Sequence, residues 1–243
     1  MAPMAYYDQS EFSIRCEWGR RGLEALLPTS DVVIIVDVFT FSTAVDVAVA
    51  RGAHVYPFRA LDAAAAEFAK SVGAHLADPN RTAHNWSLSP GSLAMIPRET
   101  RLVLPSPNGS TLSLACGAVP TFAGSIRNSQ AIAEAAQNAG TRVSVIAAGE
   151  QWPDGSIRPA LEDWIGAGAI IANLYGNRSP EAESAEATFL NAQCDLLKVL
   201  RQSSSGKELI ERGFGNDVEC ASALNHSSVA PVLRGQFYAA AIQ

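Results

Sequence analysis

A run of apolar residues is the clearest hydrophobic pattern in the chain. The segment Asp31-Val-Val-Ile-Ile-Val-Asp37-Val holds five consecutive β-branched residues. It leaves no polar side, which predicts a strand buried on both faces. From Ser42 to Gly52 the spacing of apolar residues becomes helical. We expect Ser42 or Thr43 to be the N-cap of that helix and Gly52 to end it.

The same alternation continues along the chain. The pattern predicts further strands at 54–58, 101–104, 119–123 and 142–148, and helices at 61–72, 110–115 and 129–138. Strands that alternate with helices are typical of a layered α/β domain. The expected fold class is therefore α/β, with a layered α/β/α architecture around a largely parallel or mixed sheet.

The last third of the chain has a more helical pattern. Helices are expected at 161–175 and 182–201, with shorter pieces from Lys207 and Asp217, and a terminal strand at 229–239. Two segments fit no regular element, 79–97 and 149–159, and long irregular loops in compact domains are usually functional. Because no repeat or linker divides the chain, we expect one domain over 1–243, with an internal subdivision left open near 150–160.

Composition and charge narrow the classes of protein. Hydrophobic residues make up 48% of the chain, and 18 basic against 24 acidic residues give a net charge of −6. No basic face is visible, so a nucleic-acid partner is not expected. No long apolar run or export signal is present, so we expect a cytoplasmic protein without a membrane partner. The four cysteines form no Cys-x-x-Cys pair, which argues against a zinc knuckle.

One predicted turn is suited to an anion. In open α/β sheets, ligands bind beyond the carboxyl ends of the strands. After the strand at 101–104, Asn108-Gly109 permits a tight turn, and Ser110 or Thr111 then opens a helix whose free N–H groups suit a phosphate or sulfonate. An ordinary capped turn, in which Ser110 bonds its own helix, fits these residues equally well.

Several carboxylates are candidates for a metal site. Asp37 ends a strongly apolar strand, where a carboxylate is costly unless it meets a cation or hydrogen-bond donors. Glu150, Glu162 and Asp163 add three acids around the second irregular loop. Together they could hold Mg²⁺, which takes one or two carboxylates, waters and substrate phosphate oxygens. The alternatives are that Asp37 caps the next helix and that Glu162 and Asp163 only favour a helix dipole.

Other chemistries fail on spacing. The stretch Asp37-Val-Phe-Thr40 lacks the second aspartate that is expected two residues after a phosphate-accepting aspartate, and Cys116 has no arginine shortly downstream. The sequence also has no Gly-x-Ser-x-Gly elbow, no phosphate-binding Gly-Lys loop and no His-Glu-x-x-His helix. Arg81 and Arg127 remain candidates for contact with an anion, although solvated arginines are the ordinary expectation.

The chain resembles the 2-phosphosulfolactate phosphatase (ComB) family from about Asp31 onward. The resemblance is carried by Asp37, Pro107-Asn-Gly-Ser110, Gly124-Ser125, Asn128, Ala148-Gly149, Leu161-Glu-Asp163, Ala167-Gly-Ala-Ile170, Gly213-Phe214 and Val229-Ala-Pro-Val-Leu233. It implies a Mg²⁺-dependent phosphatase of the coenzyme M pathway on a layered α/β fold. Two departures concern the substrate: Thr40 stands where the family often has arginine, and the Gly-Glu-Arg and Leu-Gly-Asn elements are missing before Ser89-Pro90.

The leading hypothesis is metal-assisted hydrolysis of a small anionic phosphomonoester. Asp37 or Asp163 would act as catalytic base or acid, and the metal ligands would be Asp37, Glu150, Glu162 and Asp163. The expected substrate-binding residues are Ser42, Asn108, Gly109, Ser110, Thr111 and Asn128. Two alternatives remain: a phosphatase for another phosphorylated hydroxy acid, and a binder of a small acid without turnover. A homo-oligomer is left open.

Overall fold

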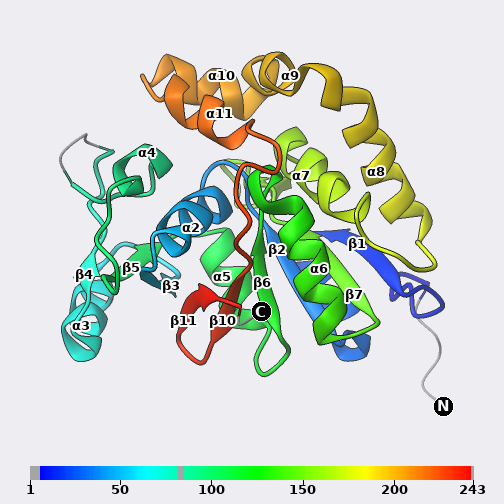
Figure 1. Cartoon of the computed structure of the whole chain (residues 1–243), viewed down its shortest axis with the longest axis horizontal. Helices are drawn as coiled ribbons and strands as arrows, with labels where there is room; N and C mark the ends of the chain where they lie inside the picture. Colours follow the sequence, from blue (N-terminus) through cyan, green and yellow to red (C-terminus); the bar gives the residue numbers. More distant parts are fainter. Residues whose placement is uncertain (1–5, 82–84, 242–243) are drawn as a thin grey trace.

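The computed structural model describes residues 6–81 and 85–241. Its central feature is a large mixed sheet. Among these residues, nine strands form this sheet in the order β1-β7-β2-β6-β10-β11-β3-β5-β4 (Figure 1). They are β1 (Ile14–Trp18), β2 (Val32–Val36), β3 (His54–Phe58), β4 (His75–Leu76), β5 (Arg101–Pro105), β6 (Thr121–Gly124), β7 (Val143–Ala147), β10 (Pro231–Arg234) and β11 (Phe237–Ala240). A separate hairpin is formed by β8 (Glu150–Gln151) and β9 (Ile157–Arg158). The expected α/β fold class is confirmed.

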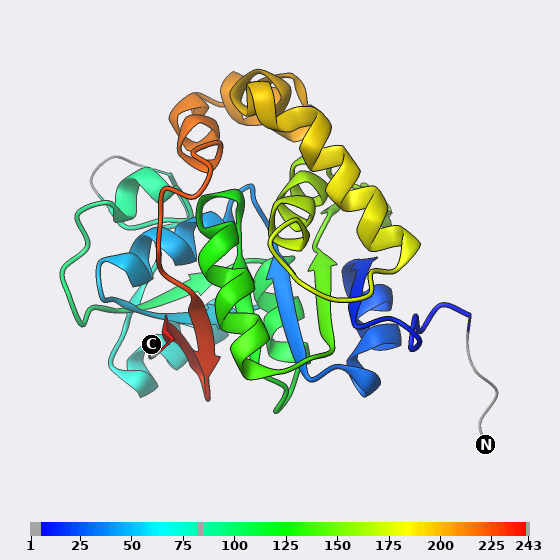
Figure 2. The ribbon, with the colours of Figure 1, turned by 45° about the vertical axis from the view of Figure 1, so that its right-hand side comes forward.

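Helices lie on both faces of the sheet and beyond one of its ends. The α-helices are α1 (Gly19–Leu26), α2 (Phe41–Ala50), α3 (Ala63–Val72), α4 (Pro90–Leu93), α5 (Gly109–Ala115), α6 (Ser129–Ala139), α7 (Leu161–Ile171), α8 (Pro180–Ala192), α9 (Leu196–Gln202), α10 (Ser204–Glu211) and α11 (Gly215–Ala221). Short 3₁₀ turns are η1 (Leu27–Thr29), η2 (Ile126–Asn128) and η3 (Gln193–Asp195). Helices α8 to α11 form an arch across the end of the sheet at which β2 and β7 end (Figure 2).

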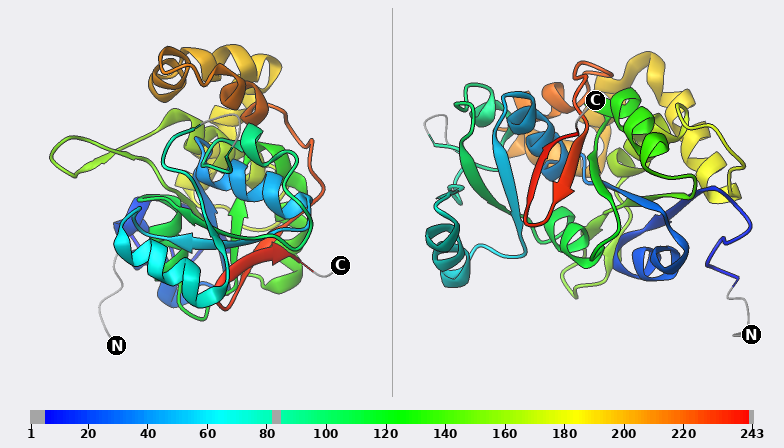
Figure 3. Two further views of the ribbon diagram at one scale, coloured as in Figure 1. Left: turned by 90° about the vertical axis from the view of Figure 1, so that its left-hand side faces the viewer. Right: turned by 60° about the horizontal axis from the view of Figure 1, so that its bottom comes forward.

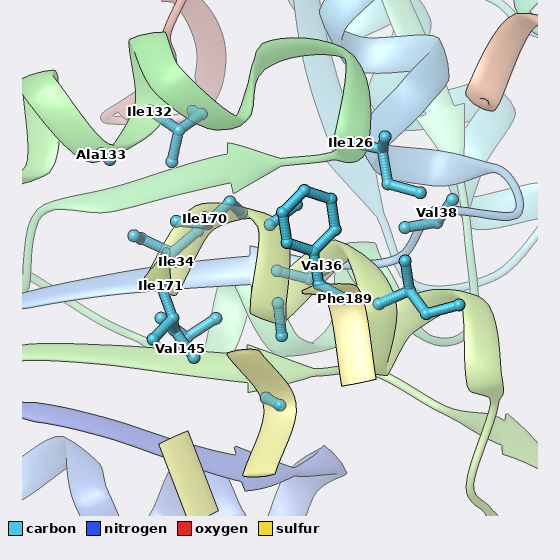
Figure 4. Packing of buried hydrophobic residues seen from close by; sticks show 14 of the residues in the cluster. Ile34, Val36, Val38, Ile126, Ile132, Ala133, Val145, Ile170, Ile171 and Phe189 are labelled. Carbon is cyan, nitrogen blue, oxygen red and sulfur yellow. The ribbon is translucent and has the colours of Figure 1, made fainter. Parts of the chain in front are cut away.

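Strand β2 is buried on both faces, as its sequence predicts. Its five residues are fully buried. Ile34 belongs to the core that includes Ile132 and Ile170 (Figure 4). Its neighbour Ile35 belongs to the core on the opposite face, with Leu23. Since side chains alternate along a strand, only a run of apolar residues satisfies both cores.

The direction of the strands changes in the middle of the sheet. Strands β1, β7, β2 and β6 are mutually parallel, and so are β3, β5 and β4. The hairpin β10–β11 lies between the two sets and pairs antiparallel with both β6 and β3. With three antiparallel pairings between them, the two sets run in opposite directions. The sheet is therefore mixed, one of the two forms that the sequence left open, and the strands before Asp37 and Asn108 belong to oppositely directed sets.

The carboxyl end of the chain differs from its predicted form. The single strand expected at 229–239 is a hairpin that turns at Gly235, whose φ is +62°. The helix expected at 182–201 is interrupted by η3, and the helix expected at 161–175 ends at Ile171. Hydrophobic periodicity cannot detect a one-turn interruption or a hairpin inside an apolar segment, so these boundaries required the tertiary structure.

Two further local predictions need correction. Strand β1 and helix α1 were not expected, because Arg15 and Glu17 interrupt the apolar pattern. Arg15 is fully buried instead, and it donates hydrogen bonds to the hydroxyls of Thr29 and Ser30. The N-cap of α2 is Thr40 rather than Ser42 or Thr43. The irregular segment 149–159 contains the hairpin β8–β9, which projects from the body (Figure 3).

The close approach of helices α7 and α8 supplies a test of the packing. A Cβ atom added at Gly168 in α7 would lie 2.0 Å from the carbonyl oxygen of Ala185 in α8. We expect Gly168→Ala to lower the free energy of unfolding by at least about 2 kcal/mol, because overpacking a core costs about 1–3 kcal/mol. Urea denaturation would measure this. The control is Gly215→Ala in α11, where the nearest atom is an ordinary 3.8 Å away; equal effects of the two substitutions would contradict the expectation.

Candidate active site

Asp37 lies at the end of β2 and anchors the site. It is 5% exposed, and its Oδ2 accepts hydrogen bonds from the Gly109 N–H at 2.8 Å and from the Ser106 hydroxyl at 3.4 Å. Its Oδ1 accepts from the Phe41 N–H at 3.4 Å. The predicted meeting of Asp37 with the Asn108-Gly109 turn is therefore confirmed. Strand β5 belongs to the oppositely directed set, yet the turn that follows it reaches Asp37. Twist that accumulates from strand to strand changes the direction of the sheet between β2 and β5.

Gly109 permits this contact because it has no side chain. A Cβ atom at this position would lie 2.2 Å from Cδ1 of Phe41 and 2.8 Å from Oδ2 of Asp37. A larger residue would therefore push the turn away from the carboxylate. The small residue and the N–H donor together explain why glycine fits at the start of α5.

Asp163 joins the two turns at the ends of β2 and β7. Its Oδ1 accepts the Val38 N–H at 2.7 Å and its Oδ2 accepts the Gly149 N–H at 2.8 Å, while the residue is 3% exposed. Both carboxylate oxygens are thus bonded to backbone, and Gly149 has the positive φ of +69° that this turn requires. This geometry fits a positioning residue and does not favour the ligand or catalytic role that the sequence suggested for Asp163.

Four carboxylates influence one another electrostatically. Burial, and secondarily the charge of Glu162, raises the pKa of Asp37 to about 6. Burial and then the charges of Asp37 and Glu162 raise the pKa of Glu150 to about 7. The pKa of Asp163 is raised well above its ordinary value, by burial and then by Asp37 and Glu162. A cluster of this kind favours protonation or a bound cation, because like charges in a desolvated site repel.

Glu162 carries an unsatisfied oxygen. The residue is 1% exposed, and its Oε2 has no hydrogen-bond partner among the described residues. Burial raises the pKa of this carboxyl group, while the hydroxyls of Ser205 and Ser203 and the charge of Arg158 oppose the rise. A buried polar atom without a partner is uncommon, and a cation or water is one way to satisfy it.

A cavity of about 250 Å³ opens above Asp37. It is lined by Asp37, Phe39, Thr40, Arg81, Leu88, Ser106, Pro107, Asn108, Glu150, Ser205, Glu208, Leu209 and Arg212. Glu208 and Leu209 follow Ser205 in α10 by three and four positions, so one face of this helix closes the cavity from the arch. The Asn108 side chain donates to Oε2 of Glu150 at 3.1 Å and forms part of the wall. Its size and polar lining suit a small anionic molecule.

Of the six predicted substrate-binding residues only Asn108 lines this cavity; the other five, Ser42, Gly109, Ser110, Thr111 and Asn128, do not. The Ser42 hydroxyl donates to the Ile35 carbonyl and accepts from the Asp37 N–H, and the Ser110 hydroxyl donates to the Leu104 carbonyl. These two residues and Asn128 are fully buried. Asn128 caps η2 and also donates to the Ala123 and Val229 carbonyls. Thr111 lines a neighbouring cavity instead. The polar side chains of Ser42, Ser110 and Asn128 therefore hold turns in place.

The cavity also contains residues that the sequence pattern did not single out. Arg212, Ser205 and Glu208 come from the arch, and Ser106 comes from the turn after β5. Arg81 was considered only as one of two candidates, and its position in an irregular loop was its sole signal. Nothing in local periodicity shows that a distant helix covers a given turn, so these residues needed the structure.

The carboxylates at the cavity are the kind of ligand that Mg²⁺ takes. Over 6–81 and 85–241, no three His, Cys, Asp or Glu side chains are arranged to hold a metal ion by themselves. Magnesium needs fewer, since it keeps waters and binds through one or two carboxylates and substrate phosphate oxygens. Asp37 and Glu150 line the cavity, and the buried Glu162 has a free oxygen. The oxygen chemistry and the excess of negative charge therefore fit a hard cation.

Fold and site together define a class: a layered α/β protein with an acidic cavity between the end of its sheet and a helical arch. A model of the 2-phosphosulpholactate phosphatase family matches residues 23–236. The chain belongs to the 2-phosphosulpholactate phosphatase family, and phosphatases of this name are phosphoric monoester hydrolases. In the part of the chain that the structure describes, no helix is both long and apolar enough to cross a membrane.

Individual relatives agree with the family. The 2-phosphosulfolactate phosphatase of Methanothermobacter thermautotrophicus is 34% identical over 153 residues, which span 60% of this chain and 64% of that protein. A probable 2-phosphosulfolactate phosphatase of Carboxydothermus hydrogenoformans is 30% identical over 207 residues, or 82% of this chain and 84% of that protein. A probable enzyme of the same name from Gloeobacter violaceus is 35% identical over 72 residues, 30% of either chain.

Proposed function

We propose that this protein is a Mg²⁺-dependent phosphatase that hydrolyses 2-phosphosulfolactate to sulfolactate and phosphate. The observation that carries the proposal is the meeting of Asp37, Glu150 and the Gly109 turn at a small polar cavity. The family and its named relatives support the substrate. The reaction would belong to a coenzyme M type of biosynthesis, and we propose a cytoplasmic location without a nucleic-acid partner.

The residues of the cavity have separate roles in this proposal. Asp37 and Glu150 would hold Mg²⁺, with Glu162 behind them, and the bound ion would neutralise charge on the phosphate oxygens. The Gly109 N–H and the Ser106 hydroxyl orient the Asp37 carboxylate. The amide of Asn108 holds Glu150 beside it. One of these two carboxylates would accept the proton of the attacking water.

Asp163 acts through the backbone in this scheme. It holds the N–H groups of Val38 and Gly149, so it keeps the turn that follows β2 against the turn that carries Glu150. Because uncatalysed phosphomonoester hydrolysis is extremely slow, small displacements of these carboxylates are expected to cost much of the rate enhancement.

Phosphate release with and without metal tests the proposal. We expect turnover of 2-phosphosulfolactate with Mg²⁺, a loss of at least about 100-fold when a chelator removes the ion, and recovery when Mg²⁺ is restored in excess. The physical reason is that a metal contributes several kcal/mol of charge stabilisation to phosphoryl transfer. Undiminished phosphate release in chelator would contradict the metal requirement.

A second candidate function rests on Thr40. Because threonine stands where the family often has arginine, a different phosphorylated hydroxy acid could be the better substrate. The same assay with a panel of such acids would decide between them by the ratio of kcat/KM values. Binding measured by calorimetry without phosphate release from any of them would instead indicate a non-catalytic binder.

A further inference from the structure

The cavity above Asp37 has two walls of different chemistry. On one side it adjoins a second cavity of about 390 Å³, with Asn108 and Glu150 in the wall that they share. On another side it adjoins a third cavity of about 200 Å³, and there the shared residues are Arg81, Leu88 and Arg212. The carboxylate wall and the guanidinium wall are therefore separate parts of one small space.

Arg81 is held firmly in its wall. Its side chain is 13% exposed, Nη1 donates to Oδ2 of Asp217 at 2.9 Å, and Nη2 donates to Oγ1 of Thr40 at 2.9 Å. Asp217 is itself buried and accepts a hydrogen bond from the Ser89 hydroxyl. Three segments far apart in the sequence thus position one guanidinium group beside the cavity. Such fixed geometry is what bidentate recognition of an acidic group requires.

Arg212 brings a second guanidinium group to the same wall. The ring of Phe214 lies under both arginines, 5.2 Å from Cζ of Arg81 and 5.8 Å from Cζ of Arg212. The Arg212 side chain is 56% exposed and its partner is Glu208, also exposed, at 3.2 Å. Burial, and after it the charge of Arg212, lowers the pKa of Arg81, so the two cations repel each other. An anion bound by both would relieve that repulsion.

We propose that Arg81 and Arg212 bind the acidic group at the non-reacting end of the substrate, a sulfonate or carboxylate, and thereby select acidic phosphomonoesters over neutral ones. This inference rests on the proposed function, since it assumes that the phosphoryl group lies at the Asp37 wall. Asp217 and Ser89 are positioning residues for Arg81. Position 40 itself is a threonine in this chain. The guanidinium group beside it belongs to Arg81 of the irregular segment 79–97, and it donates a hydrogen bond to Thr40.

The test compares three substrates. They are 2-phosphosulfolactate, 2-phospholactate, which keeps only the carboxylate, and ethyl phosphate, which has no acidic group besides its phosphate. We expect Arg81→Gln to lower kcat/KM by about 100-fold for an acidic substrate, because the variant loses charge-assisted hydrogen bonds to the acidic group. Ethyl phosphate should change less than about threefold, since it makes no such bond. An effect on 2-phosphosulfolactate alone would assign the site to the sulfonate, and an effect on both acids to the carboxylate.

Controls separate binding from folding. Arg51→Gln removes an exposed arginine at the end of α2, away from the cavity, and should leave all three substrates unchanged. Arg81→Lys should recover part of the loss because it keeps the charge. If Arg81→Gln does not fold, the exposed Arg212→Gln carries the test, with an expected loss of about 10-fold confined to acidic substrates. Equal losses on all three substrates, or none, would overturn the subsite.

Calorimetry with sulfolactate and lactate distinguishes this inference from the proposed function. Neither compound has a phosphate, so their binding reports the acidic subsite without turnover. Weaker binding to Arg81→Gln than to wild type would support the subsite even if no phosphomonoester were hydrolysed, in which case only the proposed function fails. Phosphate release by wild type together with unchanged binding to Arg81→Gln would sink the subsite and keep the phosphatase.

Discussion

The Asp37→Asn variant is expected to fold and to lose Mg²⁺-dependent phosphate release by at least about 1,000-fold. Asp37 faces the cavity with a carboxylate oriented by the Gly109 N–H and the Ser106 hydroxyl. Asparagine keeps one acceptor oxygen for these donors but removes the negative charge that would hold the cation. Removing a charge that contributes to electrostatic catalysis costs several kcal/mol of transition-state stabilisation.

The Asp37→Asn substitution should lower the activity but should not lower the thermal stability of the metal-free protein. Asp37 is buried beside Glu162 and Glu150, and burial together with that repulsion raises its pKa to about 6. A group whose pKa rises on folding stabilises the protein below its unfolded pKa, and this contribution is lost as the pH rises through 6. Without metal, Asp37→Asn should therefore unfold at the same or a higher temperature than wild type at pH 8.

Two measurements on each variant check this prediction. Phosphate release gives the activity, and thermal unfolding with and without Mg²⁺ gives the stabilisation by the ion, since a ligand that binds only the native state raises its melting temperature. The matched control is Asp195→Asn, an exposed aspartate at η3. If Asp37→Asn releases phosphate at the wild-type rate, Asp37 has no role in catalysis.

Asp163→Leu is expected to lower the free energy of unfolding by about 3–5 kcal/mol. Its two oxygens accept the buried N–H groups of Val38 and Gly149, and leucine would leave both donors unsatisfied. Each unsatisfied buried donor costs about 1–3 kcal/mol. Asp163→Asn should cost less, because its amide oxygen still accepts one of the two hydrogen bonds.

Urea denaturation measures this effect, and Glu183→Leu provides the control. Glu183 is also an acid in the first turn of its helix, α8, but it is exposed. A favourable interaction with the helix dipole is worth only about 0.3–1 kcal/mol. Similar losses for the two substitutions would show that Asp163 serves the helix dipole alone. Wild-type stability with lost Mg²⁺ binding would instead make Asp163 a metal ligand.

The Asp37 site shows how far sequence reasoning reaches. Asp37 and the Asn108-Gly109 turn were expected together, and the structure joins them at 2.8 Å. The sequence did not predict that the two strands before them run in opposite directions, because the hairpin β10–β11 reverses one set of strands. The contact between Asp37 and this turn depends on the twist of the sheet. It also depends on the buried Asp37 carboxylate, which needs hydrogen-bond donors. A terminal apolar segment gives no indication that it will enter the middle of a sheet.

The acidic residues show the complementary limit. Glu150, Glu162 and Asp163 were all expected near Asp37, and their mutual influence on pKa places them together. Their roles differ because of contacts that spacing does not encode. Asp163 meets two backbone N–H groups and Glu150 meets an amide at the cavity, while one oxygen of Glu162 has no hydrogen-bond partner in the part of the chain that the structure describes. Burial and donor geometry decide which carboxylate is structural.

Local pattern alone determined the buried strand β2, the alternation of strands and helices, and the set of acids at their ends. These follow from side-chain periodicity and from the cost of burying polar groups, which act within a few residues. The tertiary structure decided the strand order, the direction of the two parallel sets, and the placing of Arg81 and Arg212 on one wall. Those features depend on contacts between residues up to more than a hundred positions apart, whose geometry is set by the packing of the whole chain.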